Sequence, residues 1–145
     1  MSNENLKQRT KKFALEVIKL VETLPNDRTS RVIGGQLLRA GTSVGANYRA
    51  ACRAKSAADF ISKMGNVEEE ADESGYWLEL LVDAAKLKPE KAARLLDESG
   101  ELVAISVASI NTARRNNARS STGTSAQRVP RRALRTPHSA LRTPH

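Results

Sequence analysis

The sequence has a single cysteine, and aromatic residues make up only 3% of its 145 residues. One cysteine excludes an internal disulfide, which argues against a small secreted scaffold and favours an intracellular protein. Scarce aromatic residues argue against β-sandwiches, β-barrels and base-stacking sheets. No apolar run approaches the roughly 18 residues that span a bilayer, and the polar start has no signal-peptide core. We therefore expect a cytoplasmic protein with no membrane partner.

Histidine is also scarce, because both histidines, His138 and His145, lie near the C-terminal end. Cys52 therefore has no nearby motif for a zinc site or a Cys–His pair, and no helix offers the Glu-x-x-His of a di-metal bundle. The Gly34-Gly35 and Gly41-x-x-x-Gly45 pairs lack the strand and the Gly-Lys-Ser/Thr of a phosphate loop. The sequence thus predicts no enzyme, no metal and no cofactor.

Acidic residues are missing from the C-terminal part of the chain. The formal net charge is +8, and residues 114–145 hold eight arginines and no acidic residue, so residues 1–113 are formally neutral. The polar composition of residues 116–145, with its repeated Ala-Leu-Arg-Thr-Pro-His, predicts a disordered tail. Two interpretations stay open: a basic arm that contacts phosphates, or a dispensable extension, which we favour.

The neutral part is itself polarised. Residues 28–63 have seven basic residues and one acidic residue, a net charge of +6, whereas residues 64–85 have seven acidic residues and no basic one. Two such blocks can pair with each other within one chain or between copies, which is the first interpretation to weigh. Alternatively, the basic block forms an exposed surface for phosphates.

Helical periodicity covers four stretches, at about residues 6–24, 28–53, 56–87 and 88–113. Asp27 and Ser56 are expected N-caps, and Pro89 suits a first helical turn. Short connections make neighbouring helices antiparallel. The predicted fold is therefore all-α: an antiparallel up-down-up-down four-helix bundle over residues 1–115, followed by the disordered basic tail, 116–145.

Some residues on these helices predict packing contacts. Glycine in a helix costs about 1 kcal/mol relative to alanine, so Gly34, Gly41 and Gly45 indicate that a helix of this chain or of a neighbouring subunit packs closely there. Asn47 falls on the apolar stripe and would fix the register between helices. Tyr76 precedes the only tryptophan, Trp77, which either caps the core or anchors an interface.

Two stretches resemble a known family. The pattern Gln36-x-x-Arg39-Ala40 … Ser43-x-x-x-Asn47 and the stretch Glu70-Ala-Asp-Glu-Ser-Gly-Tyr-Trp-Leu-Glu-Leu80 are similar to the bacterial four-helix-bundle proteins encoded within intervening sequences of large-subunit ribosomal RNA genes. The resemblance spans roughly residues 8–114. One branch reads Asn-Tyr-Arg-Glu where this chain has Asn47-Tyr-Arg-Ala50, so Ala50 replaces that glutamate.

The resemblance implies a cytoplasmic, non-enzymatic protein that assembles into a ring-like homopentamer. A relative, the accessory protein of diversity-generating retroelements, is a basic pentamer that binds nucleic acid and a reverse transcriptase. Most members have no established biochemical role.

Two functions follow from these observations. The first is non-specific binding of RNA or DNA by an oligomer through a basic surface of the second helix, whose expected phosphate contacts are Arg31, Arg39, Arg49, Arg53, Lys55 and Lys63. The second is a protein-interaction scaffold, in which the same basic residues pair with the acidic helix of the same or a neighbouring subunit. The direction of Arg39, Arg49 and Arg53 discriminates between the two.

Overall fold

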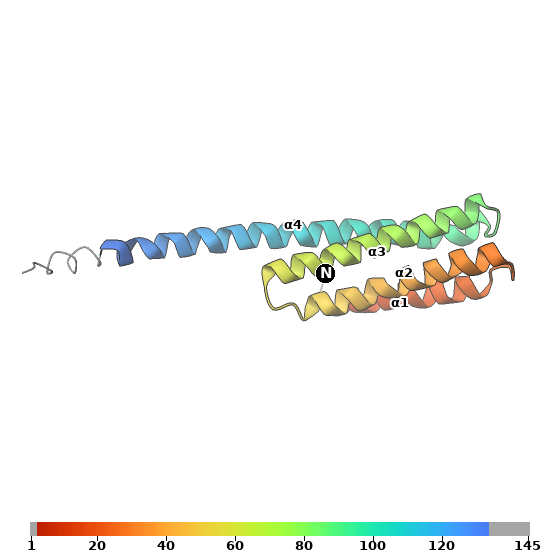
Figure 1. Cartoon of the computed structure of the whole chain (residues 1–145), viewed down its shortest axis with the longest axis horizontal. Coiled ribbons are helices and arrows are strands. Elements are labelled where there is room, and N and C mark those ends of the chain that lie inside the picture. The colour runs from red at the N-terminus through yellow and green to blue at the C-terminus, as the bar shows by residue number, and fades with distance from the viewer. Residues whose placement is uncertain (1–2, 134–145) are drawn as a thin grey trace, which may run out of the picture.

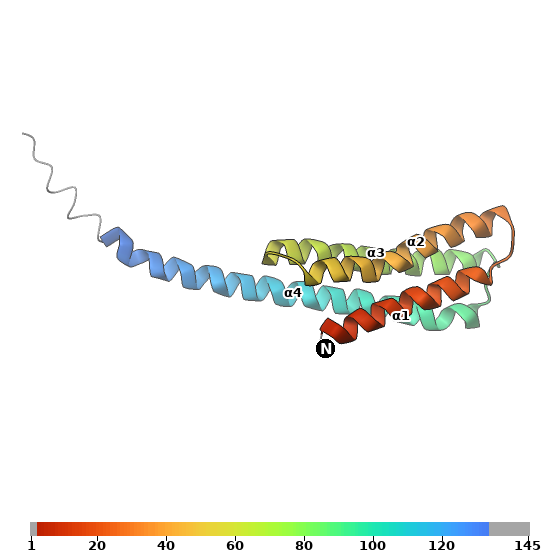
Figure 2. The same cartoon turned by 90° about the horizontal axis from the view of Figure 1, so that it is seen from below.

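The computed structural model describes the backbone of residues 3–133 and the side chains of residues 4–122. Four helices follow one another: α1 (Asn3–Glu22), α2 (Arg28–Cys52), α3 (Ala57–Asp83) and α4 (Pro89–Ala133). They run antiparallel to their neighbours in chain order, with α2 packed most extensively on α3 and α3 on α4 (Figures 1 and 2). The predicted all-α four-helix bundle is confirmed.

The helix starts follow local sequence signals. The Asp27 carboxylate accepts a hydrogen bond from the Ser30 backbone amide at 2.8 Å, and this bond is the main reason that the pKa of Asp27 is lowered. Ser56 caps α3 by accepting from the Asp59 amide at 3.0 Å. Both N-caps are those that the sequence predicts, because a side-chain oxygen must satisfy the free amides of the first turn.

The end of α3 differs from the prediction, since α3 ends at Asp83 rather than near residue 87. The Lys86 amide donates to the Leu81 carbonyl at 2.9 Å, and the Ala85 amide donates to the Val82 carbonyl at 3.0 Å. Ala85 has a φ of 59°. This is a Schellman motif, in which alanine takes the left-handed position that glycine usually occupies.

The core contains the apolar stripes of all four helices. Its fully buried side chains include Phe13 from α1, Leu37 from α2, Leu78 from α3 and Leu102 from α4. Ile110 is the last buried residue in the part of α4 whose side chains are described, and residues 114–122 are exposed.

Helix α4 continues to Ala133, into the stretch that the sequence predicts to be the tail. An established helix extends without a new nucleation step, and each added residue other than Pro130 brings a backbone amide that can donate within the helix. The extension leaves the bundle and projects beyond it (Figure 1). The rest of the expected tail, residues 134–145, lies outside the described part of the chain.

Candidate nucleic-acid interface

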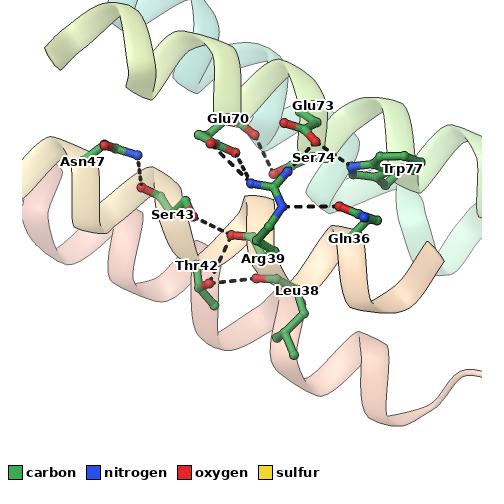
Figure 3. Close-up of polar contacts among 10 residues, drawn as sticks. All are labelled: Gln36, Leu38, Arg39, Thr42, Ser43, Asn47, Glu70, Glu73, Ser74 and Trp77. Carbon is green, nitrogen blue, oxygen red and sulfur yellow. Dashed lines mark hydrogen bonds and ion pairs between the residues drawn. The ribbon is translucent and has the colours of Figure 1, made fainter. Parts of the chain in front are cut away.

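Arg39 is held by the acidic helix and not presented as a free cation. Its guanidinium pairs with Glu70 at 3.4 Å and with Glu73, both on α3, and its Nε donates to Gln36 at 3.3 Å (Figure 3). Glu73 also accepts from the indole of Trp77 at 3.2 Å. The hydrogen bond to Glu73 is the main reason that the pKa of Arg39 is raised. These contacts join α2 to α3.

The residues of this network also carry the family resemblance. Gln36 and Arg39 come from the α2 pattern, and Glu70, Glu73 and Trp77 come from the α3 stretch. Their most direct role is therefore to fix α2 against α3 within one subunit. Of the two interpretations of the charge blocks, pairing within the chain describes Arg39.

Lys63 and Arg31 also have partners. The Lys63 ammonium contacts both carboxylate oxygens of Asp59 at 2.8 Å, and this hydrogen bond is the main reason that the pKa of Asp59 is lowered. Arg31 is exposed and donates to the Asn26 side chain at 3.0 Å. Half of the six expected phosphate contacts thus have a polar partner within the chain.

Arg49, Arg53 and Lys55 differ from those three. All are exposed, and none of their side chains forms an ion pair with another residue in the described range 4–122. Arg53 lies one turn after Arg49 and forms the C-cap of α2. Arg49 and Arg53 are therefore available to an anion outside the chain, whereas Lys55 also contributes to the lowered pKa of Asp59.

A groove of about 500 Å³ between α1 and α2 brings Arg49 together with two lysines of α1. Lys7 and Lys11 lie one turn apart on one wall, and Arg49 lines the other. Small residues such as Gly45 and Ala46 also line the groove, and Glu4 is its one carboxylate. The lining of the groove is polar and cationic, which suits a chain of phosphates better than an apolar ligand.

Sequence reasoning missed Lys7 and Lys11. Their i, i+4 spacing beside the buried α1 stripe was a usable signal, but it gives no indication of which neighbouring helix carries the third cation. Ten residues separate Arg39 from Arg49, which rotates the second about 80° from the first around the helix axis. This rotation explains why one contacts α3 and the other lines the groove with α1.

The expected close-packing glycines lie against α1 and the turn that follows it in the same chain. A Cβ on Gly34 would come within 2.9 Å of Leu24, one on Gly41 within 2.9 Å of Val17, and one on Gly45 within 3.2 Å of Thr10. The close approach of α1 and α2 that shapes the groove depends on these positions.

Asn47 contacts its own helix, because its amide donates to the Ser43 carbonyl at 2.9 Å (Figure 3). Trp77 is half-buried and packs against the core, with its ring in an edge contact with Tyr76 at 5.1 Å between centroids. Tyr76 is 52% exposed. Of these three residues, Tyr76 is the one that presents a large side chain to solvent.

Tyr76 lies within an acidic ribbon on the exposed face of α3, formed with Glu69, Asp72, Glu79 and Asp83. None of these four carboxylates forms an ion pair with another residue in the described part of the chain. A groove of about 400 Å³ between α3 and α4 runs beside the ribbon, where Asp97 adds a further carboxylate. The acidic ribbon is therefore a second charged surface that the bundle does not neutralise.

We searched the described residues for candidate metal ligands and for a reactive cysteine. No group of three or more histidine, cysteine, aspartate or glutamate side chains there could hold a metal ion. Cys52 is half-buried. Its neighbour Tyr48 has a raised pKa, mainly because the phenol is buried and also because it forms a hydrogen bond with Cys52. No helix in the described range is long and apolar enough to cross a membrane.

Comparison with known proteins places this bundle in a family context. A family model described as "23S rRNA-intervening sequence protein" matches residues 3–108. The chain is also similar to a crystal structure of a protein of unknown function from the S23 ribosomal protein family of Bacteroides thetaiotaomicron, with 36% identity and a TM-score of 0.67. That match covers 72% of this chain and 96% of the other. No curated protein matches the sequence.

Proposed function

Because the chain belongs to the 23S rRNA-intervening sequence protein family, we propose that it is a non-enzymatic, cytoplasmic homo-oligomer that binds nucleic acid without sequence selectivity. The observation that carries the proposal is the α1–α2 groove, in which Lys7, Lys11 and Arg49 are gathered without ion-pair partners in the described range. Arg53 and Lys55 add two exposed cations at the end of α2, outside the groove.

The ligand chemistry follows from what the groove offers. Lysine and arginine side chains neutralise phosphates and release condensed counterions, which supplies affinity without reading bases. The groove has no aromatic platform on which bases could stack. In an oligomer each subunit adds its own groove, so a weak contact is multiplied by the number of subunits. The family resemblance implies a ring of five.

The test replaces the three groove cations together. We expect K7Q/K11Q/R49Q to bind a labelled duplex more weakly and to lower the slope of log K against log salt by about 2.7 for each groove that contacts the duplex, since each lost phosphate contact removes about 0.9. Fluorescence anisotropy over a series of salt concentrations measures both quantities. An unchanged slope would refute the groove as the binding surface.

Two control variants sharpen this test. K19Q/K88Q/K91Q removes the same charge from exposed positions outside the groove and should leave the slope nearly unchanged. R39Q removes a cation that α3 already neutralises, so it should affect the stability of the bundle more than binding.

A protein-interaction scaffold is the second candidate function, and the acidic ribbon on α3 favours it. The first two turns of α2 present Arg28 and Arg31 beside Val32, which is 59% exposed. This arginine patch and the acidic ribbon lie on different helices and have opposite charge. Contact between the patch of one subunit and the ribbon of the next would be heterologous, which gives a ring when the rotation between subunits closes.

A further inference from the structure

The end of α4 has no packing partner in the described structure. Ala113 is half-buried, whereas every residue from 114 to 122 is exposed, and Arg115 donates only to Thr112 of its own helix, at 3.3 Å. Figures 1 and 2 show this part of α4 projecting past the end of the bundle at which α2 turns into α3. The exposed side chains of residues 114–122 therefore meet solvent or a ligand.

The composition of this projecting helix selects the ligand. Between residues 111 and 133 the apolar side chains are four alanines, Val129 and Pro130, so no apolar stripe exists for a coiled coil with a second copy. The same lack argues against a membrane surface, because an interfacial helix needs a large apolar face. What remains is charge: no acidic residue, and six arginines, at 114, 115, 119, 128, 131 and 132.

The position of the helix strengthens this argument. It projects from the end of the bundle at which α1 begins and α2 ends (Figure 2), and that end carries Lys7, Arg49 and Arg53. Residues 114–133 form about 30 Å of helix, close to one turn of a nucleic-acid duplex. Cations on the helix and on the groove therefore lie toward the same end of the bundle.

We propose that the projecting end of α4 is a second phosphate-binding element, which lies along the nucleic-acid backbone while the groove holds another part of it. Arginine suits this role because its planar guanidinium donates two parallel hydrogen bonds to a phosphate. The proposal shares its ligand class with the proposed function but uses residues outside the groove, so each can fail alone.

The experiment neutralises the three arginines whose exposure is described. In the full-length chain, R114Q/R115Q/R119Q should lower the salt slope for duplex binding by about 2.7 for each arm that contacts the duplex. R114K/R115K/R119K keeps the charge and should retain the slope. K19Q/K88Q/K91Q is the matched control for total charge, because its exposed positions lie toward the opposite end of the bundle. Thermal unfolding should be unchanged in all three variants.

Each outcome decides between the alternatives. If the glutamine variant keeps the wild-type slope, or loses no more than the control, the arm does not bind phosphates. If it releases the protein from phosphatidylserine vesicles while duplex binding is intact, the ligand is a membrane and the proposal is wrong. If the salt slope for duplex binding falls only in the groove variant, the result supports the proposed function and not the arm. If the salt slope falls only in the arm variant, the arm binds phosphates and the groove is not the binding surface.

Discussion

Gly41 shows how one missing side chain determines the distance between two helices. A Cβ there would lie 2.9 Å from both methyl groups of Val17, which is fully buried. We expect Gly41→Ala to destabilise the protein by about 1–2 kcal/mol, because overpacking costs more than the roughly 1 kcal/mol gained in helix propensity. Urea unfolding at one fixed protein concentration measures the change.

Gly35 is the matched control for that substitution. It lies on the same helix, but a Cβ there would meet nothing within 4 Å. Gly35→Ala should therefore stabilise the protein by roughly 0.5–1 kcal/mol. If both substitutions had the same sign, close packing of α1 on α2 would not be the reason for glycine at position 41.

At the same scale, the sequence predicts which residues are buried better than it predicts where a helix ends. Periodicity identifies Phe13, Leu37 and Leu78 as core residues, because a stripe at helical spacing has to face the other helices. The end of α3 is missed because its Schellman motif places Ala85, and not glycine, in the left-handed conformation. An alanine carries no signal for that position.

At the scale of the element, α1 and α4 form the weakest side of the bundle, since they touch each other less than the other neighbouring helices do. Ion pairs bridge this side. Arg9 donates to both carboxylate oxygens of Glu98, at 2.9 and 2.6 Å, and Arg94 contacts Glu16 at 2.5 Å. The Glu98 side chain is only 13% exposed, so its pair is the best protected of those on this side.

This pair predicts how stability depends on pH. The hydrogen bonds from Arg9 hold the pKa of Glu98 below its usual range. A lowered carboxyl pKa stabilises the folded state above the unfolded value, about 4.3, and that contribution is lost as the pH falls through the folded value. Glu98→Gln should therefore cost about 1–3 kcal/mol at neutral pH, and the difference from the wild type should shrink as the pH falls below about 4.

Urea unfolding at a series of pH values, followed by circular dichroism, measures this dependence. Glu101→Gln serves as the control, because the Glu101 side chain also contacts Arg9 but is 66% exposed. Its substitution should cost less and change the pH profile less. Parallel profiles for wild type and Glu98→Gln would show that the α1–α4 pair does not carry the acid sensitivity.

The helix starts were predictable where a capping residue or a proline marks them. The starts of α2, α3 and α4 follow from Asp27, Ser56 and Pro89, each of which suits the first turn of a helix. The length of α4 was not predictable, because the composition after residue 116 offers no buried surface and the extension rests on backbone hydrogen bonding alone.

At the scale of the whole molecule, the sequence shows the basic and acidic blocks. It does not show which basic residues pair within the bundle and which stay exposed. Whether a given arginine of α2 meets α3, α1 or solvent depends on its angle around the helix and on the positions of the neighbouring helices. Arg39 forms ion pairs with α3, Arg49 lines the groove with two lysines of α1, and Arg28 is exposed to solvent. Lys7 and Lys11 join the candidate site only through tertiary packing.

The two unneutralised surfaces lead to a prediction about assembly. If the arginine patch of one subunit contacts the acidic ribbon of the next, D72K/E79K should lower the oligomer mass, and R28E/R31E should do the same, because each places like charges across the interface. All four positions are exposed, so neither change should unfold the subunit. Sedimentation velocity at low and moderate salt measures the mass.

Combining both changes in one chain gives the sharper result. The quadruple variant D72K/E79K/R28E/R31E exchanges the signs of the two surfaces, so opposite charges face each other again and the oligomer should re-form. The oligomer mass can recover only if the ribbon and the patch contact each other. If the two double substitutions acted on unrelated surfaces, their losses of oligomer mass would add. A wild-type mass in either double variant, or a quadruple variant that stays dissociated, would show that assembly uses other surfaces.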